Sequence, residues 1–317
     1  MSIKGISNPP HIAASSVEHV ARDGWNLALN GAKDAASGVE HVAEDDRNLA
    51  LNGPTPGIIL QNIELYNASG PNANEPSLSD IRQGSYGDCS FLASLGALVQ
   101  NDPNAVKNMI HDNGNGTYTV ALHVQNNDFH DLWGVCGKSY TTKRVTSSAN
   151  EISPSGVHGG CDNGKQVIWP AVVEAAYAKL HDTKIFGHDL GINSGYGNIG
   201  GGSWPQPVLE TLTGRDAQSY SPLVFLIVKG AGLKSQFDNG KLIVMSTPES
   251  DGAQDGYDKG LNPYGLIGGH AYTVINVYMK NGQEYVSLNN PWGFDQPQDI
   301  PLSELPKVSD VITVGTA

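Results

Sequence analysis

The stretch HAYTVINVYMKNGQEYVSLNN, residues 270–290, contains two runs of strand-forming residues separated by a turn. Asn281-Gly282 at its centre is typical of a tight β-hairpin turn. His270 therefore lies at the start of the first strand and Asn290 at the end of the second. Pairing around the turn places Asn290 opposite Thr273, about 10 Å along the strand from His270. A bulge or register shift must close that gap if the two side chains are to meet.

The rest of the chain indicates an α+β fold. Strand-forming runs also occur at 223–228 (LVFLIV) and 241–246 (KLIVMS), so the part after about residue 220 is predicted to be β-rich. Earlier residues carry helical patterns at 89–100 (CSFLASLGALVQ) and at 169–180 (WPAVVEAAYAKL), where Pro170 suits a helix start. One alternating run, 116–124, is predicted as a strand. A helix-rich half thus precedes a β-rich half, which suggests two lobes.

The first sixty residues contain an internal repeat. SVEHVARDGWNLALNG at 16–31 recurs as GVEHVAEDDRNLALNG at 38–53, and each copy has a capping-box start and an Asn-Gly stop. Each copy predicts a short amphipathic helix that is too small to bury its apolar face alone. GPTPG at 53–57 is typical of a linker. We therefore expect a repeat region at 1–56, a helix-rich lobe at 57–217 and a β-rich lobe at 218–317.

Composition excludes some classes of function. The net charge of −13 argues against a nucleic-acid partner, which requires a basic surface. No apolar run is long enough to span a membrane, and the N-terminus lacks the apolar core of a secretory signal. We expect a protein that is cytoplasmic, or exported without a classical signal peptide. Cys136 and Cys161 could pair, which would leave Cys89 without a cysteine partner.

Cys89 lies where the pattern QGSYGDCSFLASL, residues 83–95, changes from glycine-rich to helical. A thiol at a helix N-terminus faces unpaired amides, which lower its pKa and favour the reactive thiolate. Glycines at 84 and 87 permit a tight turn that a substrate backbone can approach. The alternative is a small buried apolar residue without a chemical role.

A thiolate nucleophile needs a base, and the base needs an orienting partner. His270 suits the first role and Asn290, whose amide oxygen can accept from an imidazole nitrogen, suits the second. Trp292 could cover this pair or could be ordinary core. The side-chain amide of Gln83 could stabilise a developing oxyanion together with the Cys89 backbone N–H. Glycine content further points to Gly201, Gly202 and Gly269 as places where substrate backbone passes.

Taken together, these motifs resemble the calpain family of papain-like cysteine peptidases. The matching stretches are DIRQGSYGDCSFLASL, WPAVVEAAYAKLHD with LTG downstream, GGHAYTVINV and SLNNPWG, which occur in the family's order over about residues 78–293. The resemblance implies Cys89 as nucleophile, His270 as general base, Asn290 as its orienting partner and Gln83 in the oxyanion hole. It also implies a two-lobe papain-like fold with the active site in the cleft between the lobes.

The sequence departs from the family in two ways. Ser90 replaces the tryptophan that usually follows the cysteine, and the chain ends soon after the hairpin, without calcium-sensing accessory domains. Family members that bind calcium in this region use acids that correspond to Asp80 and Glu174, so the resemblance implies a possible structural or activating calcium. Two carboxylates are a minority of the six to eight oxygens that calcium takes, so backbone carbonyls would have to complete the shell. The acidic run at 249–258 lacks EF-hand spacing.

We therefore predict a cysteine endopeptidase that hydrolyses proteins or peptides through a thioester acyl-enzyme. The alternatives are a non-catalytic binding module and an acyl transferase that uses the same thiolate. Residues 1–56 could act as an intramolecular inhibitor, which would make the chain a zymogen, or as a recognition or export segment. No cofactor is needed for the chemistry itself.

Overall fold

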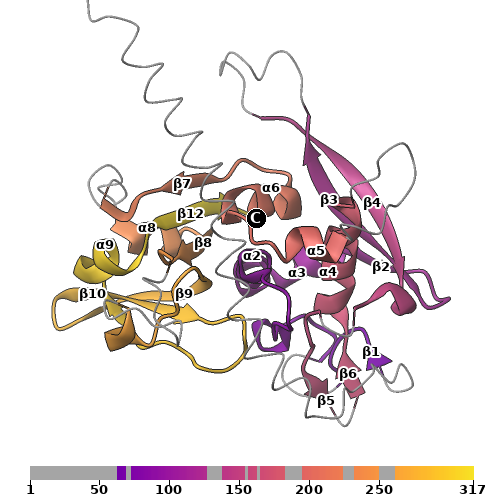
Figure 1. Ribbon diagram of the computed structural model, residues 1–317, viewed down its shortest axis with the longest axis horizontal. Helices are drawn as coiled ribbons and strands as arrows, with labels where there is room; N and C mark the ends of the chain where they lie inside the picture. The colour runs from indigo at the N-terminus through magenta and orange to yellow at the C-terminus, as the bar shows by residue number, and fades with distance from the viewer. Residues whose placement is uncertain are drawn as a thin grey trace, which may run out of the picture.

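The computed structural model describes residues 63–68, 73–126, 138–153, 156–162, 165–182, 195–223, 232–249 and 261–317. Their largest sheet is antiparallel throughout, with the strand order β11-β10-β9-β8-β12-β7. Figure 1 shows this sheet on one side of the molecule and most of the helices on the other. Its strands are β7 (Gln218–Tyr220), β8 (Lys241–Ser246), β9 (Ala271–Lys280), β10 (Gln283–Asn289), β11 (Ile300–Pro301) and β12 (Val311–Thr316).

The predicted hairpin is β9–β10, and its turn has the expected chemistry. Asn281 and Gly282 both have positive φ, 53° and 78°, as the two-residue hairpin turn requires. Pairing runs regularly from Gln283↔Lys280 to Ser287↔Asn276 and then shifts by one residue between Ser287 and Leu288. The predicted bulge is thus confirmed, and it moves the end of β10 one residue closer to the start of β9.

Strand β8 is buried on both faces because a hydrophobic core lies on each side of the sheet. Leu242 and Val244 belong to the first core, which contains the helices of the earlier part of the chain. Ile243 and Met245, on the alternate face, belong to the second core, with residues of β9, β10 and β12. A strand that is covered on both faces is a continuous apolar run, which explains the pattern KLIVMS.

Helix α2 (Cys89–Asn101) occupies the centre of the molecule (Figure 1). It begins where the carbonyl of Asp88 accepts the amides of Phe91 and Leu92, at 2.9 and 3.1 Å. It ends before Asp102, whose carboxylate caps the next helix by accepting the Ala105 amide at 3.1 Å. Residues 89–99 are all buried, so α2 is covered on every side by the rest of the protein. The predicted helix is confirmed.

One side chain of the large sheet ties α2 to β9. The Thr273 hydroxyl donates to the carbonyl of Ala93 at 2.8 Å, and Thr273 is fully buried. A Cβ atom on Gly96 would lie 2.5 Å from that hydroxyl oxygen, so only glycine permits this approach. Cys89 at the start of α2 is therefore held at a fixed place relative to the first residues of β9.

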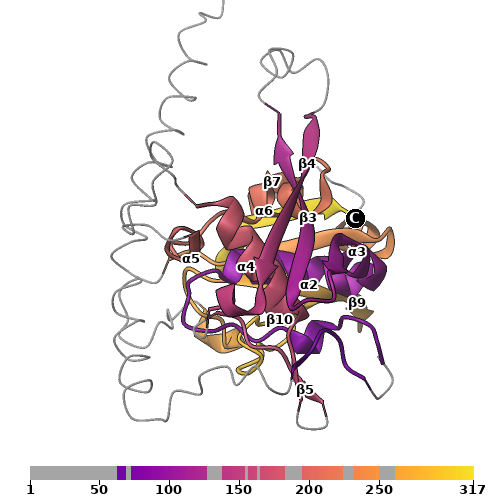
Figure 2. The ribbon, with the colours of Figure 1, turned by 90° about the vertical axis from the view of Figure 1, so that its right-hand side faces the viewer.

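The other helices and two smaller sheets complete the first core. The helices are α3 (Pro103–Met109), α4 (Trp169–Leu180), α5 (Gly195–Ile199) and α6 (Pro205–Thr213). One small sheet has the order β2-β3-β4, from Ile110–Asp112, Thr117–Gln125 and Tyr140–Ser148; the other has the order β1-β6-β5, from Ile63–Glu64, Lys165–Val167 and Cys161–Asp162. Figure 2 shows β3 and β4 as a long pair beside α4. The predicted helix at 169–180 and strand at 116–124 are confirmed.

Short elements close the second core. These are α8 (Gly232–Asp238) and α9 (Leu305–Val308), with 3-10 turns at Asn262–Tyr264 and Leu302–Glu304; two further 3-10 turns, Leu78–Asp80 and Ala149–Glu151, lie in the earlier part. The described residues thus contain both helices and strands, and the strand pairs are almost all antiparallel, which fits the α+β prediction. The 1–56 repeat, most of the run at 223–228 and Cys136 lie outside the described residues, as does the side chain of Cys161. No helix in the described ranges has the length and apolar character needed to cross a membrane.

Candidate active site

Cys89 is the first residue of α2 and a free, buried cysteine with 9% of its surface exposed. Burial raises the pKa of its thiol to about 11. The backbone amide of Ala271, the residue after His270, donates a hydrogen bond to the sulfur and opposes part of that increase. The nucleophile predicted from the sequence therefore lies against the start of β9, where burial opposes ionisation of its thiol.

His270 and Asn290 are joined, as the bulge in the hairpin allows. His270 Nε2 lies 2.9 Å from Asn290 Oδ1, and the two residues are 6% and 0% exposed. Burial lowers the pKa of His270 to about 4, although the contact with Asn290 raises it in part. An asparagine oxygen accepts hydrogen bonds, so the proton of the neutral ring is assigned to Nε2. The other ring nitrogen, Nδ1, is then left with a lone pair.

Trp292 and Tyr272 surround the imidazole. The Trp292 ring lies 5.1 Å from the His270 ring, and the Tyr272 ring meets it edge-on at 4.9 Å. The Trp292 backbone amide also donates to Asn290 Oδ1, at 3.1 Å. One asparagine oxygen therefore orients the histidine and the loop that covers it, which is the arrangement predicted for Trp292.

Cys89 and His270 are not joined by a direct hydrogen bond. Both residues belong to the described part of the chain, and within it no hydrogen bond connects the Cys89 sulfur with the imidazole. The link is instead through the neighbouring amide of Ala271. Hydrogen bonds between catalytic groups are often long in ligand-free enzymes and become shorter when substrate binds.

Gln83 lies beside this site through two contacts. Its backbone amide donates to the carbonyl of Pro291 at 2.8 Å, which links the segment before α2 to the Asn290–Trp292 loop. Its side-chain nitrogen donates to the carbonyl of Tyr86 at 2.6 Å. We call residues 83–88, which lead into Cys89, the nucleophile turn. Gln83, the predicted oxyanion donor, is the first residue of this turn, and one hydrogen of its side-chain amide is used in the bond to Tyr86.

A buried pair of carboxyl groups, which the sequence motifs do not predict, lies beside Cys89. Asp88, 2% exposed, meets Glu174 of α4, which is fully buried. Burial raises the pKa of Asp88 to about 7, and burial together with Asp88 raises that of Glu174 well above its usual value. Asp88 Oδ1, Asp88 Oδ2 and Glu174 Oε2 have no hydrogen-bond partner, so two ionised carboxylates here would be buried without compensation and the protonated forms are favoured. The Gly-Asp-Cys motif places the first acid beside Cys89, but no sequence signal identifies its partner.

The glycine-rich loop at 200–204 abuts the nucleophile turn. A Cβ atom on Gly87 would lie 2.7 Å from the carbonyl oxygen of Gly200, so the two backbones touch. Gly201 and Gly202 follow and are exposed. On the β9 side, Gly269 precedes His270 and donates its amide to Pro248 at 2.7 Å. The loops predicted to meet substrate backbone are therefore next to Cys89 and His270, respectively.

Asp80 and Glu174, the acids linked by resemblance to calcium, have different partners. Asp80 accepts from Asn67 Nδ2 at 3.1 Å, from the Ser77 amide at 2.9 Å and from Trp169 Nε1 at 2.8 Å. Glu174 Oε1 accepts the Val157 amide at 2.9 Å, whereas its Oε2 has no donor. Among the described residues, no group of three or more acidic, histidine or cysteine side chains is placed to hold a metal ion.

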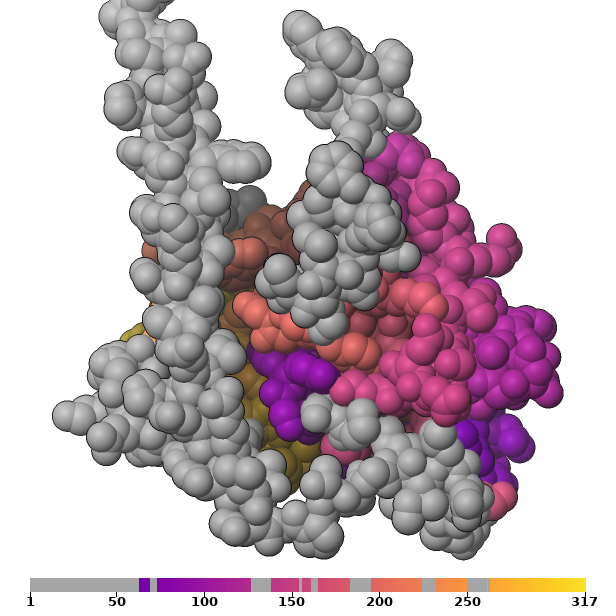
Figure 3. All heavy atoms as spheres, turned by 45° about the vertical axis from the view of Figure 1, so that its right-hand side comes forward, coloured from indigo at the N-terminus to yellow at the C-terminus, as the bar shows by residue number. Residues whose placement is uncertain are grey.

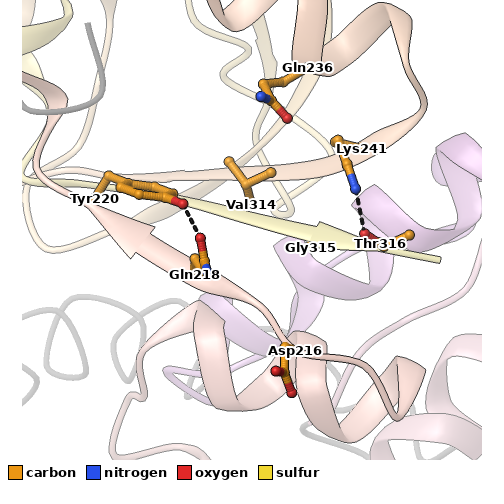
Figure 4. A pocket seen from close by; sticks show the side chains of 8 residues that line it. All are labelled: Asp216, Gln218, Tyr220, Gln236, Lys241, Val314, Gly315 and Thr316. Carbon is orange, nitrogen blue, oxygen red and sulfur yellow. Dashed lines mark hydrogen bonds between the residues drawn. The ribbon is translucent and has the colours of Figure 1, made fainter. Parts of the chain in front are cut away.

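A polar pocket of about 230 Å³ lies elsewhere, near the β7 edge of the large sheet. Figure 4 shows the residues that line it: Asp216, Gln218, Tyr220, Gln236, Lys241, Val314, Gly315 and Thr316. Tyr220 is hydrogen-bonded to Gln218, and Lys241 donates to Thr316 at 2.8 Å. None of the candidate site residues lines it, so we do not connect it with the thiol chemistry.

Comparison with known proteins identifies the family of this chain. Residues 63–298 match the family described as calpain family cysteine protease. The chain belongs to this family. It is 28% identical over 226 residues to calpain-13 of Rattus norvegicus, covering 68% of this chain and 29% of the relative. It is 26% identical over 240 residues to the calpain-type cysteine protease DEK1 of Zea mays (71% and 9%) and 27% identical over 247 residues to calpain-9 of Rattus norvegicus (75% and 31%).

The match therefore covers less than a third of the length of each of these relatives. The family match begins at residue 63, so it leaves out the 1–56 repeat. The family resemblance seen in the sequence is confirmed, and it identifies a calpain-type cysteine protease domain.

Proposed function

We propose that this calpain family domain is a cysteine endopeptidase in which Cys89, His270 and Asn290 form the catalytic triad. The observation that carries the proposal is the buried hydrogen bond from His270 Nε2 to Asn290 Oδ1, at 2.9 Å, beside a thiol at the N-terminus of α2. This bond orients the imidazole and leaves Nδ1 as the basic nitrogen. The Ala271 backbone, next to His270, interacts with the sulfur, which supports a role for this imidazole as the base that takes the thiol proton.

In the first half of the reaction, His270 Nδ1 takes the proton of Cys89 as the sulfur attacks the peptide carbonyl carbon. The unpaired amides of the first turn of α2 stabilise the thiolate. Negative charge moves to the carbonyl oxygen, where the Cys89 amide and the Gln83 side chain donate hydrogen bonds. Gln83 would turn one of its two amide hydrogens toward this oxygen while the other keeps its present contact.

The imidazolium then gives its proton to the nitrogen of the leaving peptide as the C–N bond breaks, which leaves a thioester on Cys89. A water molecule attacks the thioester, its proton passes to Nδ1, and breakage of the C–S bond releases the new carboxyl terminus. The proton on Nδ1 returns to the sulfur. Substrate backbone is expected beside Gly201, Gly202 and Gly269, and Trp292 keeps water from the His270–Asn290 bond.

The resting state implied by burial is neutral. The pKa of Cys89 is raised to about 11 and that of His270 is lowered to about 4, so between those values the proton stays on sulfur. Proton transfer then accompanies attack, as in general-base catalysis, and does not precede it as a stable thiolate–imidazolium pair. We further propose the papain-like two-lobe arrangement, with the site between α2 and the start of β9.

The test uses an internally quenched peptide library, with wild-type protein compared with Cys89→Ala and His270→Ala. We expect turnover by the wild type, loss of at least 10³-fold in both variants, and covalent labelling of Cys89 by an epoxide such as E-64. Thermal unfolding serves as the control for folding of the variants. Full activity in either variant excludes the proposal. A wild-type protein that folds but neither reacts with the epoxide nor cleaves peptides favours the binding module. If the epoxide labels Cys89 and the acyl group passes to an added amine in preference to water, the acyl transferase is favoured.

Residues 1–56 are proposed to inhibit the domain. The support is their sequence: two amphipathic repeats, each too short to bury its apolar face without a partner. Deleting residues 1–56 should raise kcat/KM on a small peptide, and adding the excised segment in trans should lower it again. Unchanged turnover on deletion contradicts inhibition and leaves recognition or export as the role of the segment.

Calcium binding stays a separate proposal. The unpartnered Oε2 of Glu174 suits a cation, but the Asp80 carboxylate is already bound by three N–H donors, so the two acids do not form a ready ligand set. No step of the mechanism above uses calcium. Adding calcium or a chelator during thermal unfolding tests the proposal without requiring activity: a midpoint that depends on calcium, and loses that dependence in Glu174→Gln, supports it.

A further inference from the structure

Phe294 is an exposed aromatic residue that packs onto the candidate active site. It is 59% exposed, the largest fraction but one among the large apolar side chains in the described residues. Its ring lies 5.6 Å from the ring of Trp292, which in turn lies 5.1 Å from that of His270. A line of three rings therefore runs from the buried imidazole to the protein surface.

The loop that carries Phe294 is built to expose it. The residues on both sides, Gly293 and Asp295, have positive φ, 82° and 48°. A Cβ atom on Gly293 would lie 2.9 Å from Arg82 Cγ, so the loop is packed against the segment before α2. Glycine adopts positive φ freely, and aspartate does so more often than most other residues, so Gly293 and Asp295 suit these positions on either side of Phe294.

Asn290 and Gln296 hold that turn from within. The Asn290 amide donates to Gln296 Oε1 at 2.8 Å, and Gln296 Nε2 donates back to the Asn290 carbonyl at 3.2 Å. Asn290 Nδ2 also donates to the carbonyl of Asp295 at 3.2 Å. The residue that orients His270 therefore also fixes the loop that presents Phe294, so the ring keeps a defined position relative to the imidazole.

The chemistry decides which part of a substrate meets these rings. His270 must protonate the nitrogen of the leaving peptide, so that nitrogen comes within hydrogen-bond distance of the imidazole that Trp292 contacts. The glycine-rich loop at 200–204 contacts residues 83–88, the turn that leads into Cys89, through the backbones of Gly200 and Gly87. Figure 3 shows indigo atoms of the segment near α2 at the surface, between salmon atoms of the chain around residue 200 and yellow atoms of the C-terminal part.

We propose that Phe294, together with Trp292, forms an apolar shelf that binds a hydrophobic side chain on the leaving-group side of the scissile bond. The inference rests on the proposed peptidase function and deepens it, because it adds a residue that determines specificity for the peptide released first. The shelf takes leucine, methionine or an aromatic side chain, since the exposed Phe294 ring and the half-buried Trp292 ring offer apolar area. Phe294 lies outside the triad and takes no part in proton transfer.

The test compares two internally quenched peptides that share one acyl portion and differ only in the residue after the scissile bond, leucine or glycine. In wild type, we expect kcat/KM to favour leucine by roughly tenfold or more, the scale of one apolar contact in a specificity site. Phe294→Ser should remove most of that preference by lowering the leucine rate, and leave the glycine rate within about twofold. Phe294→Leu, which keeps an apolar side chain, should restore it in part.

Met279→Ser is the matched control, since Met279 is a 54% exposed apolar residue on β9 outside the Trp292 loop. It should change neither rate. Equal losses for both peptides in Phe294→Ser, or a leucine preference that survives the substitution, overturn the inference while leaving the peptidase function intact. A wild type that cleaves neither these peptides nor any of the library overturns the proposed function itself, and the inference with it.

Discussion

Replacing Asn290 with alanine tests the central geometric claim. Asn290 is fully buried, and its side chain makes three hydrogen bonds: Oδ1 accepts from His270 Nε2 and the Trp292 amide, and Nδ2 donates to the Asp295 carbonyl. Alanine leaves all three groups without that partner. Asp295 is exposed, so water can replace the bond to its carbonyl, whereas the donors of His270 and Trp292 are more protected.

The expected loss of stability follows from those two donors. A buried donor without an acceptor costs about 1–3 kcal/mol, so the loss of the acceptor for both donors in Asn290→Ala should lower the free energy of unfolding by about 2–6 kcal/mol. The loss in kcat should be larger than stability alone explains, roughly 10²-fold, because the imidazole is no longer held in a productive orientation. Urea unfolding measures the first quantity, and peptide hydrolysis under conditions where the variant remains folded measures the second.

Asn290→Asp is the informative companion variant. A carboxylate still accepts from His270 and Trp292, so orientation should survive. Its charge favours the imidazolium, and should raise the pKa of His270 from about 4 by roughly one to three units. Since the base must be neutral to act, the acid limb of kcat/KM should move to higher pH by the same amount. A normal kcat in Asn290→Ala, with only reduced stability, refutes the orienting role.

Three further predictions follow from burial and packing. Alkylation of Cys89 by iodoacetamide should be slow at pH 7 and still rise above pH 9, because the pKa of the thiol is raised to about 11; a plateau near pH 7 would show that the thiolate is already formed. Burial raises the pKa of Asp88 to about 7 in the folded state, from about 4 in the unfolded chain, so this carboxyl lowers the free energy of unfolding as pH rises from 4 to 7. Asp88→Asn should make the free energy of unfolding, measured with urea, depend less on pH in this range. Gly96→Ala should lower the free energy of unfolding by roughly 1–3 kcal/mol, because the added Cβ displaces the Thr273 hydroxyl from the Ala93 carbonyl. Gly201→Ala is the control, since a Cβ there has no neighbour closer than 3.6 Å, and an equal loss of stability in both variants would contradict the packing argument.

Much of the site could be predicted because its signals are local or set by register. Asn281-Gly282 specifies a tight turn, and a turn fixes which residues lie opposite each other on the two strands. The distance between His270 and Asn290 then required a bulge, which the structure contains between Ser287 and Leu288. The start of α2 at Cys89 was equally visible, since an apolar helical pattern begins there.

The partners of individual polar groups could not be predicted in this way. Asp88 is beside Cys89 in the sequence, but its contact with Glu174 depends on how α2 and α4 pack, and 86 residues separate the two acids. The link from Gln83 to Pro291 and the exposure of Phe294 likewise depend on two distant segments meeting. Strand β12 joins the large sheet between β8 and β7 although its sequence, VITVGT, does not state its neighbours.

The amino-acid sequence by itself determined the elements, the hairpin register, the order of the candidate catalytic residues and membership of the calpain family. Only the tertiary structure decided which groups share a buried environment: it raises the pKa of the thiol and lowers that of the imidazole by burial, places a carboxyl pair beside Cys89, and extends the site to the surface with an aromatic ring. The physical reason is that helices, turns and strand register follow from interactions between near neighbours. Desolvation and hydrogen-bond partners are properties of the packed whole.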